Sequence, residues 1–572
     1  MPQRRLAVVA AAVLAALLAC LAILLYALPR GFDFLDESYY LLAYQHPGDL
    51  RLSLTQFHQL VRLMGLGSLS VIGYRVVCVV LCVGSGGALG WATLGAWRGS
   101  KPPWREALVA ATLGMLGATI YFTWGPRALS YNTLNGALCC LELVGALVLA
   151  RSSGLAVRAL VAWLVGLLIG AHALVKLPTS AVLGVAVFVA VLLVVRPTRH
   201  RLVALLALLI GAVVVPGWFF STVETPAAWY ADLKAVQSVS SHHGLVAMVW
   251  MPMRAVLGAL ARVAIAAGPA SVMVWLAARF RSVGEHVKAV ALEGVAVATA
   301  VLYIFVSRSW HTGALELERF WAPHFLCVWL AVIAWAYGEQ SQPKEASRRR
   351  LVLAAVLFAL PFVAAMGTSN LIVVQVLFHL APWHALFACC VLAVAQTRSI
   401  LPVALSLVLG VVSVAQVYAG QVSAPYGVKG TLAEQTEPLP SRLPAASSLR
   451  VSAVTARYVL ETRRLLEGAG FQPGDPVWGL NDVAGLVYLV EGRALGTPWL
   501  FRAADLEGFN CFMIEHSPRT GAREFLILSR EPSPLVRGCL ARSGRPLEAA
   551  VRLGVVDGGP EGPLSILELL PR

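Results

Sequence analysis

The 572-residue sequence predicts an α-helical polytopic membrane protein of about thirteen transmembrane helices, followed by a small C-terminal α/β or α+β domain. Apolar residues make up 58% of the chain and charged residues 13%, and the mean hydropathy is +0.74, which is far above that of a soluble globular protein. Long apolar runs recur up to about residue 420 and then stop. The two parts of the chain are therefore expected to fold in different surroundings.

Each apolar run of roughly 17 to 25 residues is long enough to cross a bilayer as a helix. The first run, Leu6 to Leu28, follows Arg4 and Arg5 and lacks an Ala-x-Ala cleavage site, so it is predicted to be a retained span. The paired runs within 157–195 and 383–419 also fit a re-entrant hairpin or a single kinked unit. The predicted spans are 6–28, 69–97, 106–124, 131–150, 157–174, 177–195, 201–220, 255–277, 289–307, 319–337, 351–367, 383–396 and 400–419.

The distribution of basic residues predicts the orientation. With the N-terminus in the cytoplasm, the inner loops hold eighteen Lys and Arg residues and the outer loops hold nine, as the positive-inside rule requires. An odd number of spans then places the C-terminal part outside the cytoplasm, and a bacterial inner (plasma) membrane is the expected location. The predicted organisation is a membrane domain over 1–420 with a first outer loop at 29–68, a linker at 421–445, and a soluble extracytoplasmic domain at 446–572.

The C-terminal part has the pattern of a small soluble domain. Val454 to Gly468 has helical spacing, whereas short apolar runs such as Val487–Val490 and Phe525–Leu528 favour strands. Cys511 and Cys539 lie in this part, where an extracytoplasmic location permits a disulfide. The sequence leaves open whether the two cysteines are bridged.

Three carboxylates crowd the first outer loop, in the run Gly31-Phe-Asp-Phe-Leu-Asp-Glu-Ser-Tyr-Tyr40. Adjacent carboxylates at the edge of a bilayer are costly to keep. Asp36 and Glu37, flanked by aromatic residues, suit a site that removes a proton or stabilises a developing positive charge. The alternative interpretation is that the pair only caps the outer end of a helix.

The layout around this run resembles that of the C-class (GT-C) integral-membrane glycosyltransferases, the group that includes protein O-mannosyltransferases and lipid A aminoarabinose transferases. An apolar span is followed by Phe34–Tyr40 and then by an amphipathic outer segment, Leu50 to Leu66, that leads to the second span. The resemblance implies a membrane glycosyltransferase that moves a sugar from a polyprenyl-phosphate donor to an acceptor on the outer face. Asp36 matches the first acid of the family's Asp-Glu pair and is the expected base. Glu37 would orient the acceptor or supply the second charge, and Asp33 is the substitute candidate.

A lipid-phosphate leaving group needs cations and hydrogen-bond donors near the outer face of the membrane, because its negative charge grows as the bond to the sugar breaks. Snorkelling of the side chain to ordinary lipid phosphate is the alternative interpretation for each cation. The candidates for binding the donor phosphate are Arg127, Lys176, His172, Arg75 and Tyr131.

Two further outer loops supply candidates for the acceptor side, namely His242, His243, Glu316 and Glu318. The two histidines could ligate a metal, but no third ligand follows at helical spacing. Some C-class enzymes hold a divalent ion partly through an acidic residue of the second outer loop, and here Trp124 to Ser130 contains no Asp or Glu. A metal-independent, inverting transfer without a cofactor is therefore expected.

The net charge of +15 does not indicate nucleic acid as a partner, because topology accounts for most of the inner-loop charges and the other arginines are scattered. The expected partners are the membrane, a polyprenyl-phosphate sugar lipid and an unidentified acceptor, which is a glycan, lipid or protein. A multi-span transporter or lipid flippase is the alternative function, although the sequence has no convincing internal repeat of the transporter kind. A non-catalytic assembly or sensor protein is the third interpretation.

Overall fold

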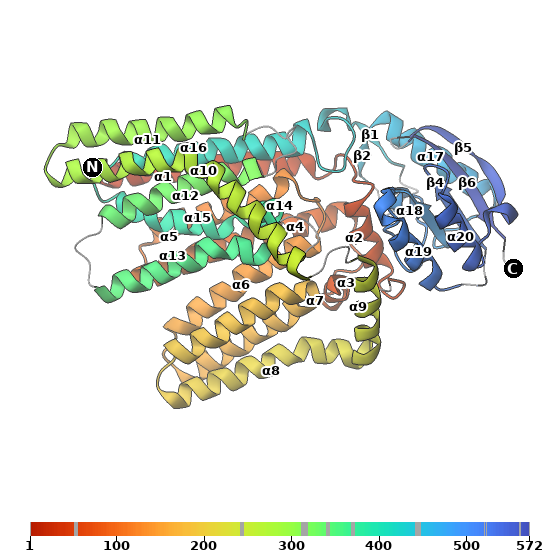
Figure 1. Ribbon diagram of the computed structural model, residues 1–572, viewed down its shortest axis with the longest axis horizontal. Coiled ribbons are helices and arrows are strands. Elements are labelled where there is room, and N and C mark those ends of the chain that lie inside the picture. Colours follow the sequence, from red (N-terminus) through yellow and green to blue (C-terminus); the bar gives the residue numbers. More distant parts are fainter. Residues whose placement is uncertain are drawn as a thin grey trace.

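The computed structural model describes residues 2–50, 55–240, 245–309, 318–338, 344–367, 372–440, 448–519, 521, 523–559 and 562–570. A bundle of long helices forms one end of the molecule and an α/β domain forms the other (Figure 1). The N-terminus lies at the end of the bundle that is remote from this domain. The predicted fold class, a helical membrane protein with a small C-terminal domain that contains strands, is confirmed.

The apolar runs form the helices of the bundle. Ten helices of the described residues are long and apolar enough to cross a membrane, and the bent pair formed by 372–379 and 381–394 raises the number to eleven. The bundle helices are α1 (Pro2–Ala27), α4 (Val71–Arg98), α5 (Trp104–Thr119), α6 (Tyr131–Arg151), α7 (Leu155–Val194), α8 (Thr198–Thr222), α10 (Leu245–Ser282), α11 (His286–Val306), α12 (Glu318–Gly338), α13 (Lys344–Ala365), α14 (Ile372–Gln375), α15 (Ala381–Val394) and α16 (Leu401–Tyr418).

Helix α7 is a hairpin of two antiparallel limbs, although its residues are helical almost throughout. The backbone breaks at Lys176, with φ −156° and ψ 85°. The guanidinium of Arg158 donates a hydrogen bond to the carbonyl of Arg196 over 2.6 Å, whereas a straight helix would hold these residues about 57 Å apart at 1.5 Å per residue. Ser180 Oγ likewise donates to the carbonyl of Ile169 over 2.8 Å. Each limb has roughly 20 residues, enough for one span, so the predicted spans 157–174 and 177–195 correspond to the two limbs.

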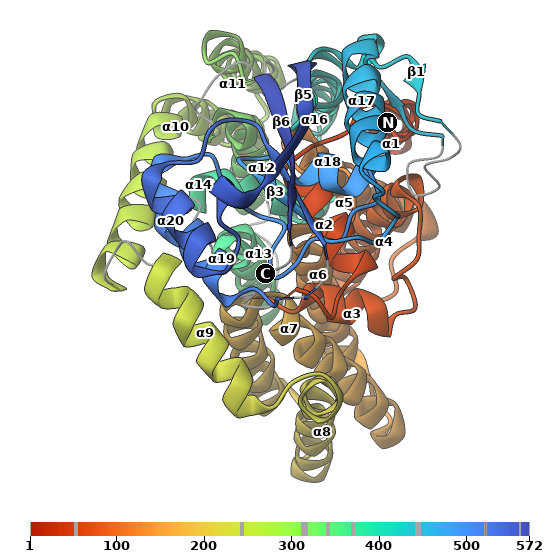
Figure 2. The same ribbon diagram turned by 90° about the vertical axis from the view of Figure 1, so that its right-hand side faces the viewer.

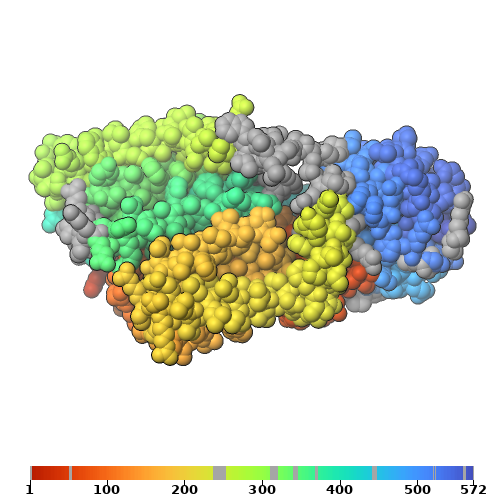
Figure 3. All heavy atoms as spheres, turned by 60° about the horizontal axis from the view of Figure 1, so that its bottom comes forward, coloured from red at the N-terminus to blue at the C-terminus, as the bar shows by residue number. Residues whose placement is uncertain are grey.

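Three shorter helices lie at the end of the bundle that faces the α/β domain: α2 (Asp36–Gln45), α3 (Phe57–Leu63) and α9 (Pro226–Ser240) (Figure 1). The hairpin of α7 reaches the same end, because the amide of Gln56, just before α3, donates to the carbonyl of Leu174 over 2.7 Å. Figure 3 shows α9 beside the C-terminal domain, where it contacts α19 (Glu507–His516). The first outer loop is thus enclosed between the bundle and the domain.

The C-terminal domain is a four-stranded sheet with helices packed on it (Figure 2). The strand order is β3 (Val477–Leu480), β4 (Glu524–Leu528), β6 (Gly562–Leu569), β5 (Val551–Gly559). β3 and β4 are parallel, and the other pairs are antiparallel. The remaining elements are β1 (Glu437–Pro438), β2 (Arg450–Val451), α17 (Ala453–Gly468), α18 (Ala484–Leu489), α19 and α20 (Pro534–Arg542).

Two predictions for this domain are confirmed and one is wrong. The helix expected at Val454–Gly468 is α17, and the strand expected at Phe525–Leu528 is β4. Val487–Val490 is not a strand, because residues up to Leu489 belong to helix α18. The run is buried on all sides, and a short, fully buried apolar run has no periodicity that separates helix from strand. Cys511 of α19 and Cys539 of α20 form a disulfide with a Cα to Cα distance of 5.4 Å.

Candidate active site

Asp33 caps the first helix of the outer loop. Its carboxylate accepts hydrogen bonds from the backbone N–H of Leu35 over 2.9 Å and of Glu37 over 3.0 Å, so it satisfies N–H groups that have no partner within α2. Asp33 therefore accepts the capping hydrogen bonds, while Asp36 and Glu37 lie in the first turn of α2, where the helix dipole favours negative charge. Burial and the neighbouring charge of Asp36 raise the pKa of Asp33 to about 7, although the two N–H donors oppose this shift.

Glu37 forms a fully buried ion pair with Arg75 of α4. The guanidinium donates from Nε to Oε1 and from Nη2 to Oε2, each over 2.7 Å. Burial alone would raise the pKa of Glu37, but the charge and hydrogen bonds of Arg75 lower it below the ordinary value. The remaining donors of Arg75 reach the carbonyls of Gly31, Leu28 and Arg30 over 2.8, 2.5 and 3.4 Å. All five N–H groups of an arginine thus have protein acceptors, and Arg75 fastens the outer loop to the bundle.

Asp36 has a different environment from both neighbours. Its side chain is half-buried, and among the described residues its carboxylate accepts one hydrogen bond, from the hydroxyl of Tyr426. The Tyr426 ring lies edge-on to Trp124, with 5.6 Å between the ring centroids. Burial raises the pKa of Asp36 above its ordinary value; the Tyr426 hydroxyl opposes this shift and the carboxylate of Asp482 adds to it. A carboxylate with a raised pKa is a stronger base than an ordinary one.

Arg127 lies beside the same loop and is 5% exposed. Its Nη1 donates to the carbonyls of Arg30 and Ala27, the second over 3.3 Å. Nη2 is buried and has no hydrogen-bond partner among the described residues. Gly31, with φ +67°, would bring a Cβ within 3.1 Å of this nitrogen, so glycine keeps the space around it open. Arg127 therefore has N–H groups left for a ligand, whereas Arg75 has none.

Lys176 and His172 take part in a polar network at the end of the bundle that faces the α/β domain. The ammonium of Lys176, 3% exposed, donates to the carbonyl of Ala364 over 2.7 Å, which leaves two of its three N–H groups available. His172 is held between Glu142 and Asn135, with 2.8 Å from each ring nitrogen to its partner. Asn135 also contacts His379 over 3.2 Å. Sequence reasoning missed His379, since no spacing links it to residues more than 200 positions earlier.

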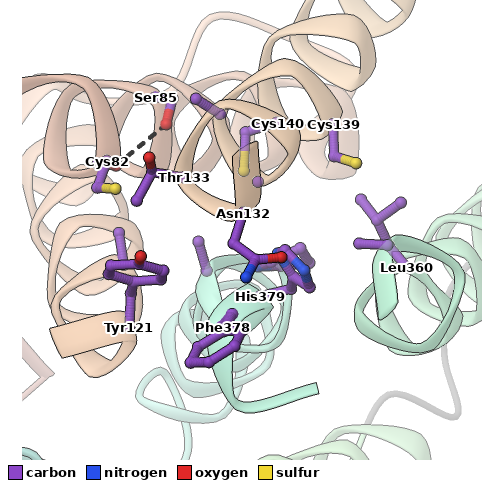
Figure 4. A pocket seen from close by; sticks show the side chains of 16 residues that line it. Cys82, Ser85, Tyr121, Asn132, Thr133, Cys139, Cys140, Leu360, Phe378 and His379 are labelled. Carbon is purple, nitrogen blue, oxygen red and sulfur yellow. Dashed lines mark hydrogen bonds between the residues drawn. The ribbon is translucent and has the colours of Figure 1, made fainter. Parts of the chain in front are cut away.

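A small cavity lies next to this network. Its wall is largely apolar but includes Asn132 and His379, whose side chains are labelled in Figure 4. Oδ1 of Asn132 and Nδ1 of His379 are buried without a hydrogen-bond partner among the described residues. Ala364, whose carbonyl binds Lys176, also lines the cavity. Ala364 thus connects the lysine to an apolar cavity that contains unused polar groups.

The other predicted site residues are less closely connected to this arrangement. Tyr131, the first residue of α6, lies 6.1 Å from Tyr40 between ring centroids. His242, His243 and Glu316 lie outside the described residues, and Glu318 is the first residue of α12. Among the described residues no three His, Cys, Asp or Glu side chains come close enough together to hold a metal ion.

The chain is distantly similar to a known structure. No family model and no curated protein matches the chain. Among solved structures, the chain is similar to a crystal structure of ArnT from Cupriavidus metallidurans in the apo state, with 12% sequence identity, a TM-score of 0.38 and coverage of 97% of each chain. At this TM-score the likeness adds nothing to the account of the site, which rests on the contacts described above.

Proposed function

We propose that the chain is a membrane glycosyltransferase that moves a sugar from a polyprenyl-phosphate donor to an acceptor at the outer face of the membrane, with Asp36 as the base. The observation that supports this proposal is that the three carboxylates have different contacts. Asp33 caps α2 and Glu37 pairs with Arg75. Asp36 makes neither of these contacts; its side chain is half-buried and accepts a hydrogen bond from Tyr426.

The proposed reaction uses these groups as follows. Asp36 accepts the proton of an acceptor hydroxyl or amine. The acceptor atom attacks the anomeric carbon from the face opposite the phosphate, the bond between that carbon and the phosphate oxygen breaks, and the electron pair leaves with the polyprenyl phosphate. This displacement inverts the anomeric centre. Lys176 and Arg127, which keep N–H groups available, stabilise the charge that develops on the leaving phosphate.

The apolar cavity beside Lys176 suits the part of the donor lipid that is next to the phosphate. Its wall includes Leu360, Phe378 and Pro382, and its polar groups Asn132 and His379 lie near the carbonyl that binds Lys176. Ligand sites are typically apolar with a small number of polar groups. His172 and Arg75, whose hydrogen-bonding groups are all occupied, are assigned to the framework of the site.

The test of the proposed function is transfer from a labelled donor. Purified full-length protein in lipid vesicles is incubated with a radiolabelled polyprenyl-phosphate sugar and with membrane extract as a source of acceptors. A glycosyltransferase moves the label into a new product and releases polyprenyl phosphate. A transporter or flippase instead moves the unchanged lipid across the vesicle membrane, and a non-catalytic protein does neither.

Lys176→Met is expected to weaken use of the donor. Loss of one charge-assisted hydrogen bond to the phosphate costs about 1.5 to 3 kcal/mol, which corresponds to roughly tenfold or more in kcat/KM for the donor. Lys288→Met is the matched control, because it removes the same charge from an exposed side chain in a surface ion pair with Glu285. Unchanged donor kinetics in Lys176→Met would remove Lys176 from the phosphate site.

The orientation of the chain in the membrane gives a second prediction. With thirteen crossings and the N-terminus inside, a reporter fused after Ala424 is expected outside the cytoplasm, and one inserted at Gln342 is expected inside. Alkaline phosphatase and green fluorescent protein fusions report the two compartments. A cytoplasmic Ala424 would contradict the predicted orientation and, because the C-terminal domain contacts the first outer loop, would place that loop in the cytoplasm as well.

A further inference from the structure

The C-terminal domain contacts the first outer loop at several points. The backbone of Arg450 in β2 accepts from Gly31 N–H over 2.7 Å and donates to the carbonyl of Pro29 over 2.6 Å. Arg493 forms a bidentate ion pair with Asp49, beyond the other end of α2. The two ends of the 29–50 segment are thus both attached to the domain.

Aromatic contacts fill the space between these attachments. The ring of Tyr39 stacks on Trp499, with centroids 4.2 Å apart and an interplanar angle of 12°. The ring of Phe32 stacks on Tyr488 of α18, with centroids 5.8 Å apart. Tyr39 and Phe32 are both buried. The domain therefore packs against the loop that carries Asp36.

Helix α18 brings one particular segment of the domain to the start of α2. The N–H of Gly485 donates to the carbonyl of Phe34 over 2.8 Å. A Cβ at Gly485 would come within 2.5 Å of the Cα of Phe34 and within 2.8 Å of Ser38 Oγ, so only glycine permits this approach. Asp482 lies three residues before Gly485, and Asp36 lies two residues after Phe34.

The backbone at Asp482 is held in an unusual conformation. Asn481 and Asp482 follow β3 with φ values of +67° and +66°, a region that residues other than glycine adopt rarely and mostly for a local reason. The segment is fixed in place, since Asp482 N–H donates to the carbonyl of Leu500 over 3.0 Å and Ser529 Oγ donates to the carbonyl of Asn481 over 2.8 Å. The sheet thus presents this loop at the carboxyl end of its parallel strands, where α/β domains commonly place functional residues.

We propose that Asp482, which the C-terminal domain brings to the start of α2, is a positioning residue of the reaction site that acts through Asp36. This inference rests on the proposed function of Asp36. It gives the domain a role in catalysis, because the domain then completes the site instead of serving as an appended binding module.

Other groups also face Asp36, and their effects differ from that of Asp482. Asp33 carries a second negative charge but is committed to the cap of α2, and Tyr426 donates a hydrogen bond that opposes the effect of Asp482. The Glu37 and Arg75 charges are joined in one buried pair. The titratable and charged groups around Asp36 are Asp33, Glu37, Arg75, Arg127, Tyr40, Tyr131, Tyr426 and Asp482.

The test follows the titration of Asp36 in the purified full-length protein. Infrared spectroscopy reports the carboxyl group, and the Asp36 signal is the one that disappears in Asp36→Asn. In Asp482→Asn the pKa of Asp36 is expected to fall, because a repelling charge is removed and Asn tolerates the positive φ at this position. Asp482→Glu keeps the charge and is expected to retain the original titration. Asp557→Asn is the matched control, since it removes a carboxylate from an exposed position on β5 of the same domain.

The pH profile of transfer gives the second readout. Transfer requires deprotonated Asp36, so activity is lost as the pH falls through the pKa of Asp36. This acid limb of the pH profile is expected at lower pH in Asp482→Asn than in the wild type. Asp482→Gly also removes the charge and adopts positive φ freely; it replaces Asp482→Asn if that variant does not fold. A folded variant without charge at 482 whose infrared titration and acid limb match those of the wild type would overturn the inference.

Failure of this inference and failure of the proposed function give different results. The infrared titration needs no substrate, so it measures the influence of Asp482 on Asp36 whether or not transfer is found. If wild-type protein transfers the sugar and Asp36→Asn does not, the proposed function stands. In that case, an unchanged pKa of Asp36 in Asp482→Asn rejects only the role of Asp482. If Asp36→Asn transfers the sugar as well as the wild type does, the base assignment fails, and the role of Asp482 fails with it.

Discussion

Asp36→Asn is expected to lower glycosyl transfer by about a hundredfold or more, which is the lower end of the usual contribution of a general base. Asn keeps the size of the side chain and can still accept the hydrogen bond from Tyr426, but it cannot take up the acceptor proton. The cap of α2 is provided by Asp33 and the buried ion pair by Glu37. Folding and binding of the donor should therefore persist, and the measurement is transfer by the purified variant at saturating donor.

Asp33→Asn is the matched control for this prediction. It removes a carboxylate three residues away and keeps one of the two oxygens that cap α2, so transfer should change less than in Asp36→Asn. Full activity in a correctly folded Asp36→Asn variant would contradict the assignment. A large loss in Asp33→Asn with no loss in Asp36→Asn would move the base to Asp33.

Arg75→Met is expected to destabilise the protein by about 3 to 5 kcal/mol, because it leaves the Glu37 carboxylate buried without its partner. Arg75 and Glu37 both have fully buried side chains, so water does not replace the lost interaction. The measurement is the thermal unfolding midpoint of the purified protein in detergent, together with its yield in the membrane.

A double variant and an exposed pair serve as controls for Arg75→Met. Glu37→Leu combined with Arg75→Met removes both charges, and such replacement of a buried ion pair by apolar residues is often neutral or stabilising; it should recover much of the lost stability. Glu285→Gln disrupts an exposed ion pair with Lys288 and should cost about 1 kcal/mol or less. An unfolding midpoint for Arg75→Met equal to that of the wild type would show that the pair does not hold the loop.

The sequence predicted the membrane domain well because the bilayer imposes a simple rule on composition and length. Every apolar run of sufficient length proved helical, including the two limbs of α7, where Lys176 and Pro178 mark the turn. The error at Val487–Val490 arose where that rule does not apply. In a small soluble domain a short buried run obtains its conformation from tertiary packing, which a single sequence does not encode locally.

The sequence located the candidate site in the first outer loop, but it could not assign tasks to the three carboxylates. Their roles depend on groups that are distant along the chain: Arg75 for Glu37, and Tyr426 and Asp482 for Asp36. His379 reaches its network in the same way. Arg75 was predicted to bind phosphate on the basis of its depth in the membrane, and the structure instead pairs it with Glu37. The depth of a residue in the membrane can be predicted from its position in a span, but the residue that pairs with a charged side chain is determined by the fold.

The central claim is that Asp36 and the phosphate-binding cations serve one reaction site. The measurement that tests it most directly is a structure of the full-length protein with a non-hydrolysable polyprenyl-phosphate sugar analogue. The account predicts the phosphate within hydrogen-bond distance of Lys176 or Arg127, and the anomeric carbon placed so that an acceptor beside it can reach Asp36. An analogue bound elsewhere on the bundle, with Asp36 remote from its sugar, would contradict the account.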